Sequence, residues 1–415
     1  MTDHYDALEA RAPETREQAL MAALPRQIAH AQQASPAFAE ILAGVDPATV
    51  TSRAALAKLP VTRKSQLLER QIAQRADNPF GGFSALAFGA QMPRVFSSPG
   101  GIYEPEGRGG DYWRMARAIH AAGFRAGELV HNSFSYHFVP AGAMMETGAQ
   151  ALGCTVFAAG TGQTEQQVQA MAELRPAGYI GTPSFLRILM EKAQAQGQSL
   201  PSLRKALVSG EAFPPSLRDW LAERGVDGYQ CYATADLGLI AYETPAREGL
   251  VVDENVIVEI VRPGTNDPVP EGEVGELVVT TLNPGYPLVR FGTGDLSAVL
   301  PGHCPTGRTN TRIRGWMGRA DQTTKVRGMF VHPSQIDQVV RRFDELLRAR
   351  LVVRGEMAND TMELLVETHA SDEALLRRIG DCVRELTKLR CEVRPLAPGA
   401  LPNDGVVIED ARSYR

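Results

Sequence analysis

The sequence predicts an α/β protein with a large N-terminal domain of mainly parallel sheets, a small β subdomain and a mobile α+β C-terminal lid. Short apolar runs alternate with amphipathic helical segments between residues 95 and 240. The pattern changes to period-two runs from about 250 to 320, and a shorter block of helices and strands follows. Because 415 residues exceed the usual size of one hydrophobic core, two unequal domains are expected.

The first 320 residues supply most of this prediction. Residues 1–80 are mainly helical in pattern, with apolar positions at Leu20, Leu24 and Ile28. Further on, short strands alternate with longer helices, which indicates βαβ units and a parallel sheet. The expected strands are TVFAAG, GYIGTP and KALVS, and the expected helices span 111–122, 165–174 and 185–194.

The second half of the chain predicts two further parts. NVIVEIVR and ELVVTTL are period-two runs separated by a segment rich in Pro and Gly, which is typical of an antiparallel hairpin. The last block predicts helices over 334–347 and 373–388, with RARLVVR, TMELLVE and CEVR as strands. We therefore expect a domain over 1–320, β-rich from about 250, and a lid over 321–415 with its hinge at Asp321.

Composition excludes several classes of protein. Hydrophobic residues make up 44% and charged residues 22%, as in soluble globular proteins. A net charge of −5 without a basic run argues against nucleic-acid binding, and no stretch of about 20 apolar residues predicts a membrane span. The charged N-terminus does not resemble a secretory signal, and five scattered cysteines favour reduced thiols in a cytoplasm. A homodimer stays open as an assembly.

Residues 291–337 carry the most informative functional pattern. Asp295 lies in a Gly-flanked turn after an apolar strand, and Arg319 begins an Arg-x-Asp turn about one hairpin later. A carboxylate accepts hydrogen bonds from sugar hydroxyls and a guanidinium donates to them, so the two side chains together can hold a ribose. The surrounding glycines allow the backbone to swivel there.

Six motifs in order resemble the adenylate-forming superfamily and, within it, the phenylacetate–CoA ligase-like group. They are SSPGGIYEPEG, VSGEAF, CYATADLG, FGTGDL, GRADQTTKVRGMFVHPSQID and LPNDG, which together span nearly the whole chain. The resemblance implies that ATP activates a carboxylic acid to an acyl-adenylate with loss of pyrophosphate, and that the acyl group passes to the thiol of CoA. It implies Mg²⁺ as a cofactor, and a small acid, ATP and CoA as partners.

The resemblance gives the SSPGGIYEP segment the role of the phosphate-gripping loop. Ser97, Ser98 and Gly100 would present hydroxyls and backbone N–H groups to the triphosphate. The superfamily usually has a lysine where this chain has Glu104, and a glycine where it has Pro99. Loss of the positive charge leaves the affinity for phosphate open.

Further nucleotide roles are also implied by the resemblance. Tyr232 would stack on adenine, which needs only an aromatic face. Asp236 would hold Mg²⁺ through a carboxylate oxygen, and Thr234 would supply a hydroxyl because Ala235 stands at the family's threonine. The segment whose backbone meets adenine matches Gly210, Glu211 and Ala212.

On the predicted lid side, the resemblance assigns the hinge and the second half-reaction. Arg319 would join Asp295 on the ribose, and Lys325 would contribute to cofactor binding. Arg327 and Gly328 would line the CoA tunnel once the hairpin that carries them has swung into place.

The pocket for the acid is expected, by the same resemblance, at HNSFSYHFVPAG and IGTPSFL. Ser135, Tyr136, His137 and Phe138 combine aromatic walls with polar atoms, which suits a flat acid such as an aryl or arylacetic acid. No base is required, because the substrate enters as a carboxylate. Some members of the group carry a Cys-rich zinc knuckle, but here only His303 and Cys304 match it, with Thr306 at another Cys position, so no zinc is expected.

The C-terminal LPNDG segment departs from the family at its lysine, whose position falls on Val406. An ammonium placed at developing charge contributes several kcal/mol, whereas valine carries no charge, so the adenylation step is expected to be slow. Lys325 and Lys388 are the candidate replacements. Three hypotheses stay open: a CoA ligase with a weakened first step, which we favour, an enzyme whose acceptor is an amine, and a non-catalytic binding protein. Val406 could also be an engineered substitution that traps a complex.

Overall fold

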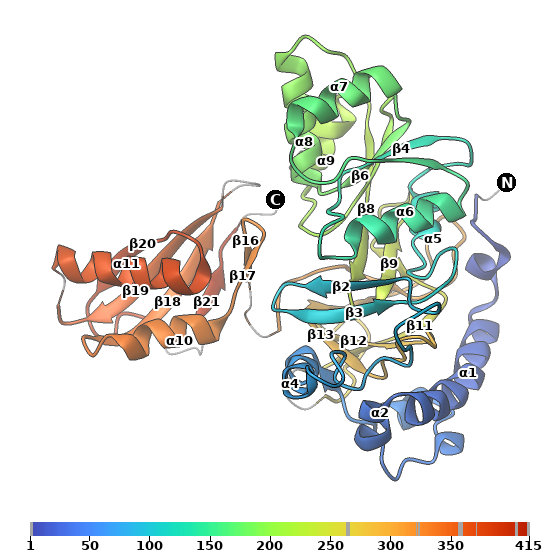
Figure 1. Ribbon diagram of the computed structural model, residues 1–415, viewed down its shortest axis with the longest axis horizontal. Coiled ribbons are helices and arrows are strands. Elements are labelled where there is room, and N and C mark those ends of the chain that lie inside the picture. Colours follow the sequence, from blue (N-terminus) through green and yellow to red (C-terminus); the bar gives the residue numbers. More distant parts are fainter. Residues whose placement is uncertain are drawn as a thin grey trace. The chain divides into compact units, whose positions relative to one another are not determined.

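The chain divides into two compact units, Met1–Met317 and Gly318–Arg415. The computed structural model describes residues 3–262, 266–320, 322, 324–355, 360–370, 372–402 and 406–412. Figure 1 traces the first unit from blue to light orange and the second in orange and red. The predicted boundary at 320 lies three residues beyond the observed one, and the predicted hinge residue Asp321 lies outside the described residues.

Helices dominate the beginning of the first unit because apolar residues recur at helical spacing. In α1, the side chains of Leu20, Leu24 and Ile28 are buried and pack with residues of the nearby strands in one core. Pro13 and Pro36 begin α1 and α2, where the missing N–H costs nothing. The elements are η1 (Ala7–Ala10), α1 (Pro13–Ala34), α2 (Pro36–Ile41), η2 (Pro47–Thr49), α3 (Arg53–Leu56), β1 (Thr62–Arg63) and α4 (Lys64–Gln74).

A large sheet, here called the central sheet, forms the middle of the first unit. Its order is β14-β15-β10-β9-β8-β7-β6-β4-β5. The strands from β5 to β8 are parallel to their neighbours, and those from β8 to β14 are antiparallel. Their bounds are β4 (Leu129–Asn132), β5 (Thr155–Ala158), β6 (Gly178–Gly181), β7 (Lys205–Val208), β8 (Asp227–Thr234), β9 (Gly238–Glu243), β10 (Leu250–Val252), β14 (Val299–Leu300) and β15 (Arg312–Ile313).

Helices connect the parallel strands and cover both faces of the central sheet. The chain leaves β4 outward through α6 to β5, then returns past β4 through α7 to β6 and continues through α8 and α9. Right-handed crossovers therefore place α6 on one face of the sheet and α7, α8 and α9 on the opposite face, as Figure 1 shows. The helices are α5 (Ala116–Ala121), α6 (Ala141–Ala151), α7 (Thr164–Leu174), α8 (Pro183–Ala195) and α9 (Pro215–Ala222).

The reversal of direction at β4 creates a crevice at the carboxyl ends of the parallel strands. The loops that follow β4, β6, β7 and β8 meet there because these strands are in register, with Asn132 beside Ile180 and Val208 beside Gln230. We call this set of loops the carboxyl edge. Ligands bind at such an edge in open α/β sheets, so its side chains are the first candidates for a site.

The β-rich part predicted from 250 to 320 divides between two sheets. β10, β14 and β15 extend the central sheet, while β11 (Val256–Val261), β12 (Gly275–Thr281) and β13 (Phe291–Ser297) form a side sheet with β1 in the order β1-β13-β12-β11. The predicted hairpin is confirmed, since β11 and β12 pair antiparallel from Val256–Thr281 to Val261–Glu276. A separate hairpin consists of β2 (Arg94–Ser98) and β3 (Ile102–Glu106), where the sequence had indicated a loop.

The helix predicted over 111–122 begins later, at Ala116. Arg114 has a φ of 64°, which a helix does not tolerate, and the Asp111 carboxylate accepts hydrogen bonds from the backbone N–H groups of Met115 and Ala116. The carboxylate thus satisfies free N–H donors at the helix start, and residues 112–114 precede the helix.

The second unit is an α+β domain with its own core. β20-β19-β18-β21 is its sheet, and α10 and α11 join the strands in one apolar cluster with Ile336, Val339 and Ile379 buried. The helix predicted to reach 347 ends at Arg342, and β18 begins at Leu346. The elements are β16 (Thr324–Val326), β17 (Met329–Val331), α10 (Pro333–Arg342), β18 (Leu346–Arg354), β19 (Thr361–Thr368), α11 (Glu373–Thr387), β20 (Glu392–Leu396) and β21 (Ile408–Asp410).

Candidate active site

Tyr232 and Asp295 meet beside the carboxyl edge although 63 residues separate them. Tyr232, on β8, donates from its hydroxyl to Asp295 Oδ2 at 2.5 Å, and Asp295 is on β13 of the side sheet. Trp316 Nε1 donates to Asp295 Oδ1 at 3.2 Å. A carboxylate is the kind of group that accepts hydrogen bonds from the hydroxyls of a sugar. The contact with Trp316 is one that sequence reasoning did not find.

The loop after β7 carries the predicted adenine-facing segment. Gly210 has a φ of 82°, in the region that favours glycine, and its neighbours Glu211 and Ala212 follow the strand end directly. Glu211 Oε1 accepts a hydrogen bond from the backbone of Ser184 at 2.7 Å, at the start of α8. A carboxylate at a helix N-terminus is favourable, so this bond fixes the loop to the next element.

Asp236 follows β8 in a turn and is 3% exposed. Lys64 Nζ donates to its Oδ2 at 2.8 Å, whereas no described residue donates a hydrogen bond to its buried Oδ1. A buried carboxylate oxygen without a donor is costly, and a cation is the partner that would satisfy it. Thr234 Oγ1 accepts from the backbone of Leu237 at 3.1 Å, so this hydroxyl holds the turn on which Asp236 lies.

Lys64 was not among the residues that the sequence singled out. Its segment, LPVTRKSQLLE, contains none of the six motifs, and Lys64 is the first residue of α4. The ion pair with Asp236 joins positions 172 residues apart, so local pattern gives no sign of it. Its side chain is 36% exposed while that of Asp236 is 1% exposed, so the lysine reaches from the surface to a buried acid.

The β2–β3 hairpin, which was predicted as a phosphate-gripping loop, contains a buried carboxyl group, that of Glu104. Ser98 donates from both Oγ and its backbone N–H to Glu104, across the turn that contains Gly100. Glu104 is fully buried, and burial together with the charge of Asp236 raises the pKa of Glu104 to about 8. Ser97 donates its backbone N–H to Phe138 O at 2.7 Å, which ties the hairpin to the carboxyl edge.

The loop after β4 contains the residues predicted to bind the acid. Tyr136 is half-buried, and its hydroxyl accepts from Asn132 Nδ2 at 2.8 Å. A Cβ on Gly142 would lie 2.9 Å from the Tyr136 ring, so the glycine lets α6 begin close against that ring. The other predicted members are arranged differently: Ser135 Oγ bonds with the backbone of His137, and Phe138 is 82% exposed with a φ of 62°.

The second unit contains the remaining predicted residues. Lys325 lies on β16 with Nζ 5.8 Å from the Phe330 ring centroid, and the backbone and side chain of Arg327 donate to Asp360. Arg327 and Gly328 form the β16–β17 turn, both at positive φ. Arg319 belongs to this unit and Asp295 to the first, so their shared ribose role stays a prediction.

Val406 lies just before β21, and its backbone carbonyl makes a hydrogen bond. Arg350 Nε donates to Val406 O at 3.0 Å, and Val407 N–H donates to Gln322 Oε1 at 2.8 Å. Of the lysines considered as replacements, Lys388 donates to Glu385 O at the end of α11, 2.9 Å away. These contacts hold the backbone at Val406 and Val407, and the valine side chain at position 406 carries no charge.

Cys304 has a structural environment. It is 3% exposed, and its Sγ lies 3.2 Å from Thr244 Oγ1 and 3.0 Å from Thr306 Oγ1. His303, the other residue that matches the family's zinc knuckle, is exposed. Over the described part of the chain, groups of three or more His, Cys, Asp or Glu side chains placed to hold a metal ion do not occur.

Comparisons with known proteins first define a class. The family model described as "AMP-binding enzyme" matches residues 112–284. That range contains the parallel strands of the central sheet, the carboxyl edge, Tyr232 and Asp236. The match indicates the class of AMP-binding enzymes.

Two relatives then identify the family. A phenylacetate–coenzyme A ligase of Thermus thermophilus is 32% identical over 377 residues, which covers 86% of this chain and 82% of the relative. A phenylacetate–coenzyme A ligase of Aromatoleum evansii is 31% identical, over 78% of this chain and 74% of that protein. The chain therefore belongs to the phenylacetate–CoA ligase family of adenylate-forming enzymes.

Known structures show the same fold. The crystal structure of 2-hydroxyisobutyryl-CoA ligase in complex with 2-HIB-AMP and CoA superposes with a TM-score of 0.81, at 24% identity, over 98% of this chain and 92% of that one. At this identity the likeness concerns the fold alone. In the described part of the chain, the helices are too short or too polar to cross a membrane.

Proposed function

We propose that the carboxyl edge of the first unit is where this acid–CoA ligase activates an aryl or arylacetic acid with ATP. The observation that carries the proposal is the Tyr232–Asp295 contact, which combines an aromatic face with an acid able to accept from sugar hydroxyls. The activity itself, formation of an acyl-adenylate followed by transfer to CoA, is that of the family.

The nucleoside is held in the proposal by three elements around the edge. Adenine stacks on Tyr232 and meets the backbone of Gly210, Glu211 and Ala212, while the ribose hydroxyls donate to Asp295. Because Tyr232 and Trp316 already hold the Asp295 carboxylate, its orientation is set before the ligand arrives. Arg319 is proposed as the second ribose contact and Asp321 as the hinge.

The phosphate side is proposed to use a metal ion and a lysine from α4. Asp236 fits Mg²⁺, which binds through one or two carboxylates plus phosphate oxygens and waters. Its Oδ1 has no donor among the described residues, and Lys64 fixes Oδ2. When bound, Mg²⁺ would neutralise phosphate charge. Lys64 would orient Asp236 and add positive charge on the side where the family's lysine is replaced by Glu104.

The acid is proposed to lie along Tyr136, in the loop after β4. The Tyr136 ring is fixed by the Asn132 hydrogen bond and by the close start of α6, so it offers a flat wall that does not have to be ordered on binding. Ser135, His137 and Phe138 are proposed as the rim of this pocket. Lys325, Arg327 and Gly328 are proposed to face CoA during the second half-reaction.

One experiment tests the function directly. Pyrophosphate release is measured over a panel of benzoates, arylacetates and aliphatic acids, with and without CoA. We expect release with at least one aryl acid and a CoA-dependent thioester product. Thioester formation from none of the acids, with an amine consuming the adenylate instead, would favour the amide-forming alternative. ATP binding without pyrophosphate release from any acid would favour a non-catalytic binding protein.

Assembly and location complete the proposal. We propose a cytoplasmic enzyme, based on its five scattered cysteines, which are all in the thiol state. A homodimer is the proposed assembly, and light scattering coupled to size exclusion measures it. A monomer mass across micromolar concentrations would contradict it.

A further inference from the structure

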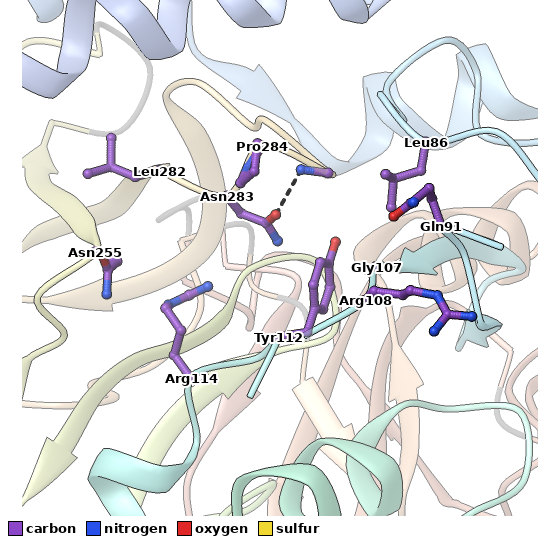
Figure 2. A pocket seen from close by; sticks show the side chains of 11 residues that line it. Leu86, Gln91, Gly107, Arg108, Tyr112, Arg114, Asn255, Leu282, Asn283 and Pro284 are labelled. Atoms are coloured by element: carbon purple, nitrogen blue, oxygen red, sulfur yellow. Dashed lines mark hydrogen bonds between the residues drawn. The ribbon is translucent and has the colours of Figure 1, made fainter. Parts of the chain in front are cut away.

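A cavity of about 370 Å³ lies in the first unit apart from the residues assigned to the nucleotide and the acid. Its wall is formed by the segment after β3, the turn before β11 and the β12–β13 connection (Figure 2). This volume is within the range of small-molecule sites, which begins at roughly 300 Å³. The predicted site residues of the carboxyl edge do not line it.

The lining presents donors rather than acceptors. Two arginines, Arg108 and Arg114, and three side-chain amides line the cavity, and none of its described lining residues is acidic. Asn283 Oδ1 is occupied, since it accepts from the backbone of Gly285 at 2.9 Å, which leaves its Nδ2 as the available group. Such a wall matches an anionic group.

The two guanidinium groups are held but not saturated. Arg108 is exposed and uses Nε for Ala90 O. Arg114 uses Nε for Asp253 and Nη2 for the carbonyl oxygens of Leu237 and Leu239. Among the described residues none accepts a hydrogen bond from Arg114 Nη1, so the outer edge of each fork can still donate.

Tyr112 stands between the two arginines in Figure 2, with its hydroxyl directed towards Asn283. The Tyr112 Oη is buried and makes no hydrogen bond to a described residue. Burial raises the pKa of Tyr112 to about 12, and the nearby Asn283 side chain acts in the opposite direction on this pKa. A buried hydroxyl that lacks a partner costs free energy unless a ligand or water supplies one. Leu86, Leu282 and Pro284 add apolar surface beside it.

We propose that this cavity binds a small organic anion, with its carboxylate or phosphate group on the guanidinium and amide donors and its apolar part against Leu282 and Pro284. Carboxylate and phosphate share this chemistry, because both accept hydrogen bonds from a guanidinium fork. Arg114 links this cavity to the catalytic side. Its Nη2 donates to the carbonyl oxygens of Leu237 and Leu239, which follow Asp236 in the chain, at 2.6 Å and 3.0 Å.

Binding is measured by calorimetry on the full chain with three probes: benzoate, phenyl phosphate and, as the neutral control, benzamide. Arg108→Gln removes one guanidinium, and Asn255→Trp fills the opposite end at an exposed residue. Arg224→Gln is the matched control, because Arg224 is also a surface arginine that donates to a backbone carbonyl, 3.0 Å away. Hydrogen exchange with and without probe locates the occupant.

We expect one anion to bind and benzamide not to, with roughly a tenfold or greater loss in Arg108→Gln or Asn255→Trp and none in Arg224→Gln. Exchange should slow at 107–114 and 282–285. The tighter of benzoate and phenyl phosphate identifies the anionic group. Wild-type affinity in both cavity variants, equal binding of benzamide, protection confined to 133–142, or no binding below about 10 mM would each overturn the proposal. None of these readouts depends on ligase activity.

Discussion

The nucleoside side and the phosphate side of the carboxyl edge differ in how closely they follow the family. On the nucleoside side, Tyr232 and Asp295 match the family's motifs and contact each other. In the segments that the family uses for phosphate, the sequence departs at Glu104, Ala235 and Val406. The Glu104 side chain is buried against Ser98, so it does not supply the positive charge of the family's lysine. The difference fits the proposal that nucleoside binding is kept while other groups supply positive charge for the phosphates.

Lys64 is the feature of the first unit that fits this difference. It pairs with Asp236 at 2.8 Å, and Asp236 is the acid proposed to hold Mg²⁺. In the proposal, a lysine at this place would supply charge to the phosphate side without replacing the family's lysine at either of its usual sequence positions. Substitutions on the two sides should therefore have separable effects.

The largest effect is expected from Asp295→Ala on the nucleoside side. Removal of the carboxylate takes away the proposed acceptor for the ribose hydroxyls and the hydrogen bonds from Tyr232 and Trp316, so AMP binding should fall at least roughly a hundredfold. Calorimetry measures it, and Asp219→Ala, at an exposed acid on α9, is the control. AMP affinity like that of the unchanged chain would contradict the ribose assignment.

Val406→Lys should act in the opposite direction and only on the first half-reaction. A restored ammonium would stabilise the charge that develops on the phosphate oxygens, so acid-dependent pyrophosphate release should rise roughly a hundredfold or more. Thioester formation from pre-made acyl-AMP should change little. The argument from the missing lysine fails if the rate of adenylation stays the same.

Lys64→Gln should lower pyrophosphate release roughly tenfold to a hundredfold while AMP affinity changes less than about twofold. The reason is that Lys64 is proposed to act on the phosphate side through Asp236, and AMP lacks the pyrophosphate part whose charge a bound Mg²⁺ would neutralise. Lys64→Arg, which keeps the charge, should recover part of the rate. Equal losses of AMP affinity and of rate would show a structural role only.

Glu104→Gln should give the smallest effect, a change in stability with pH. Glu104 has a pKa of about 8 in the folded chain against 4.5 as its ordinary value. Between these values the folded state holds the proton more tightly, so the stability of the unchanged chain falls as pH rises through this window. Glutamine does not ionise, so the variant should gain on the order of 2 kcal/mol relative to the unchanged chain between pH 5 and pH 8.

Thermal unfolding at several pH values measures this difference between the two chains. Glutamine can still accept a hydrogen bond from Ser98, so the hairpin should keep its form in the variant. A constant gap in melting temperature from pH 5 to pH 8 would show that Glu104 is not held neutral by burial.

Local patterns were sufficient for much of the fold. Strands and helices alternate with clear periods between β4 and β8, so the parallel sheet and its loop ends followed from sequence. One prediction that failed was the start of α5. The Asp111 carboxylate caps this helix so that it begins at Ala116, and hydrophobic periodicity gives no sign of a cap. The short strand β21 was missed because only three residues pair with β18.

The candidate site was predictable only where motifs carry it. Tyr232, Asp236 and Asp295 were found through their neighbours in sequence, whereas Lys64 and Trp316 were not. The Lys64–Asp236 pair depends on how α4 packs against β1 and β13 of the side sheet and against β3, and no periodic pattern encodes that placement. Only the ion pair with Asp236 singles out Lys64 as a candidate site residue, since a lysine that begins a surface helix is common.

The comparison between the two sides is tested most directly by measuring both half-reactions in the unchanged chain. Acyl-AMP formation from ATP and an aryl acid is timed by pyrophosphate release, and thioester formation is timed from the same pre-made acyl-AMP and CoA. We predict that the second rate exceeds the first by at least roughly tenfold, because nucleoside binding is kept while the first step lacks the lysine at position 406. Equal rates, or a faster first step, would contradict the account.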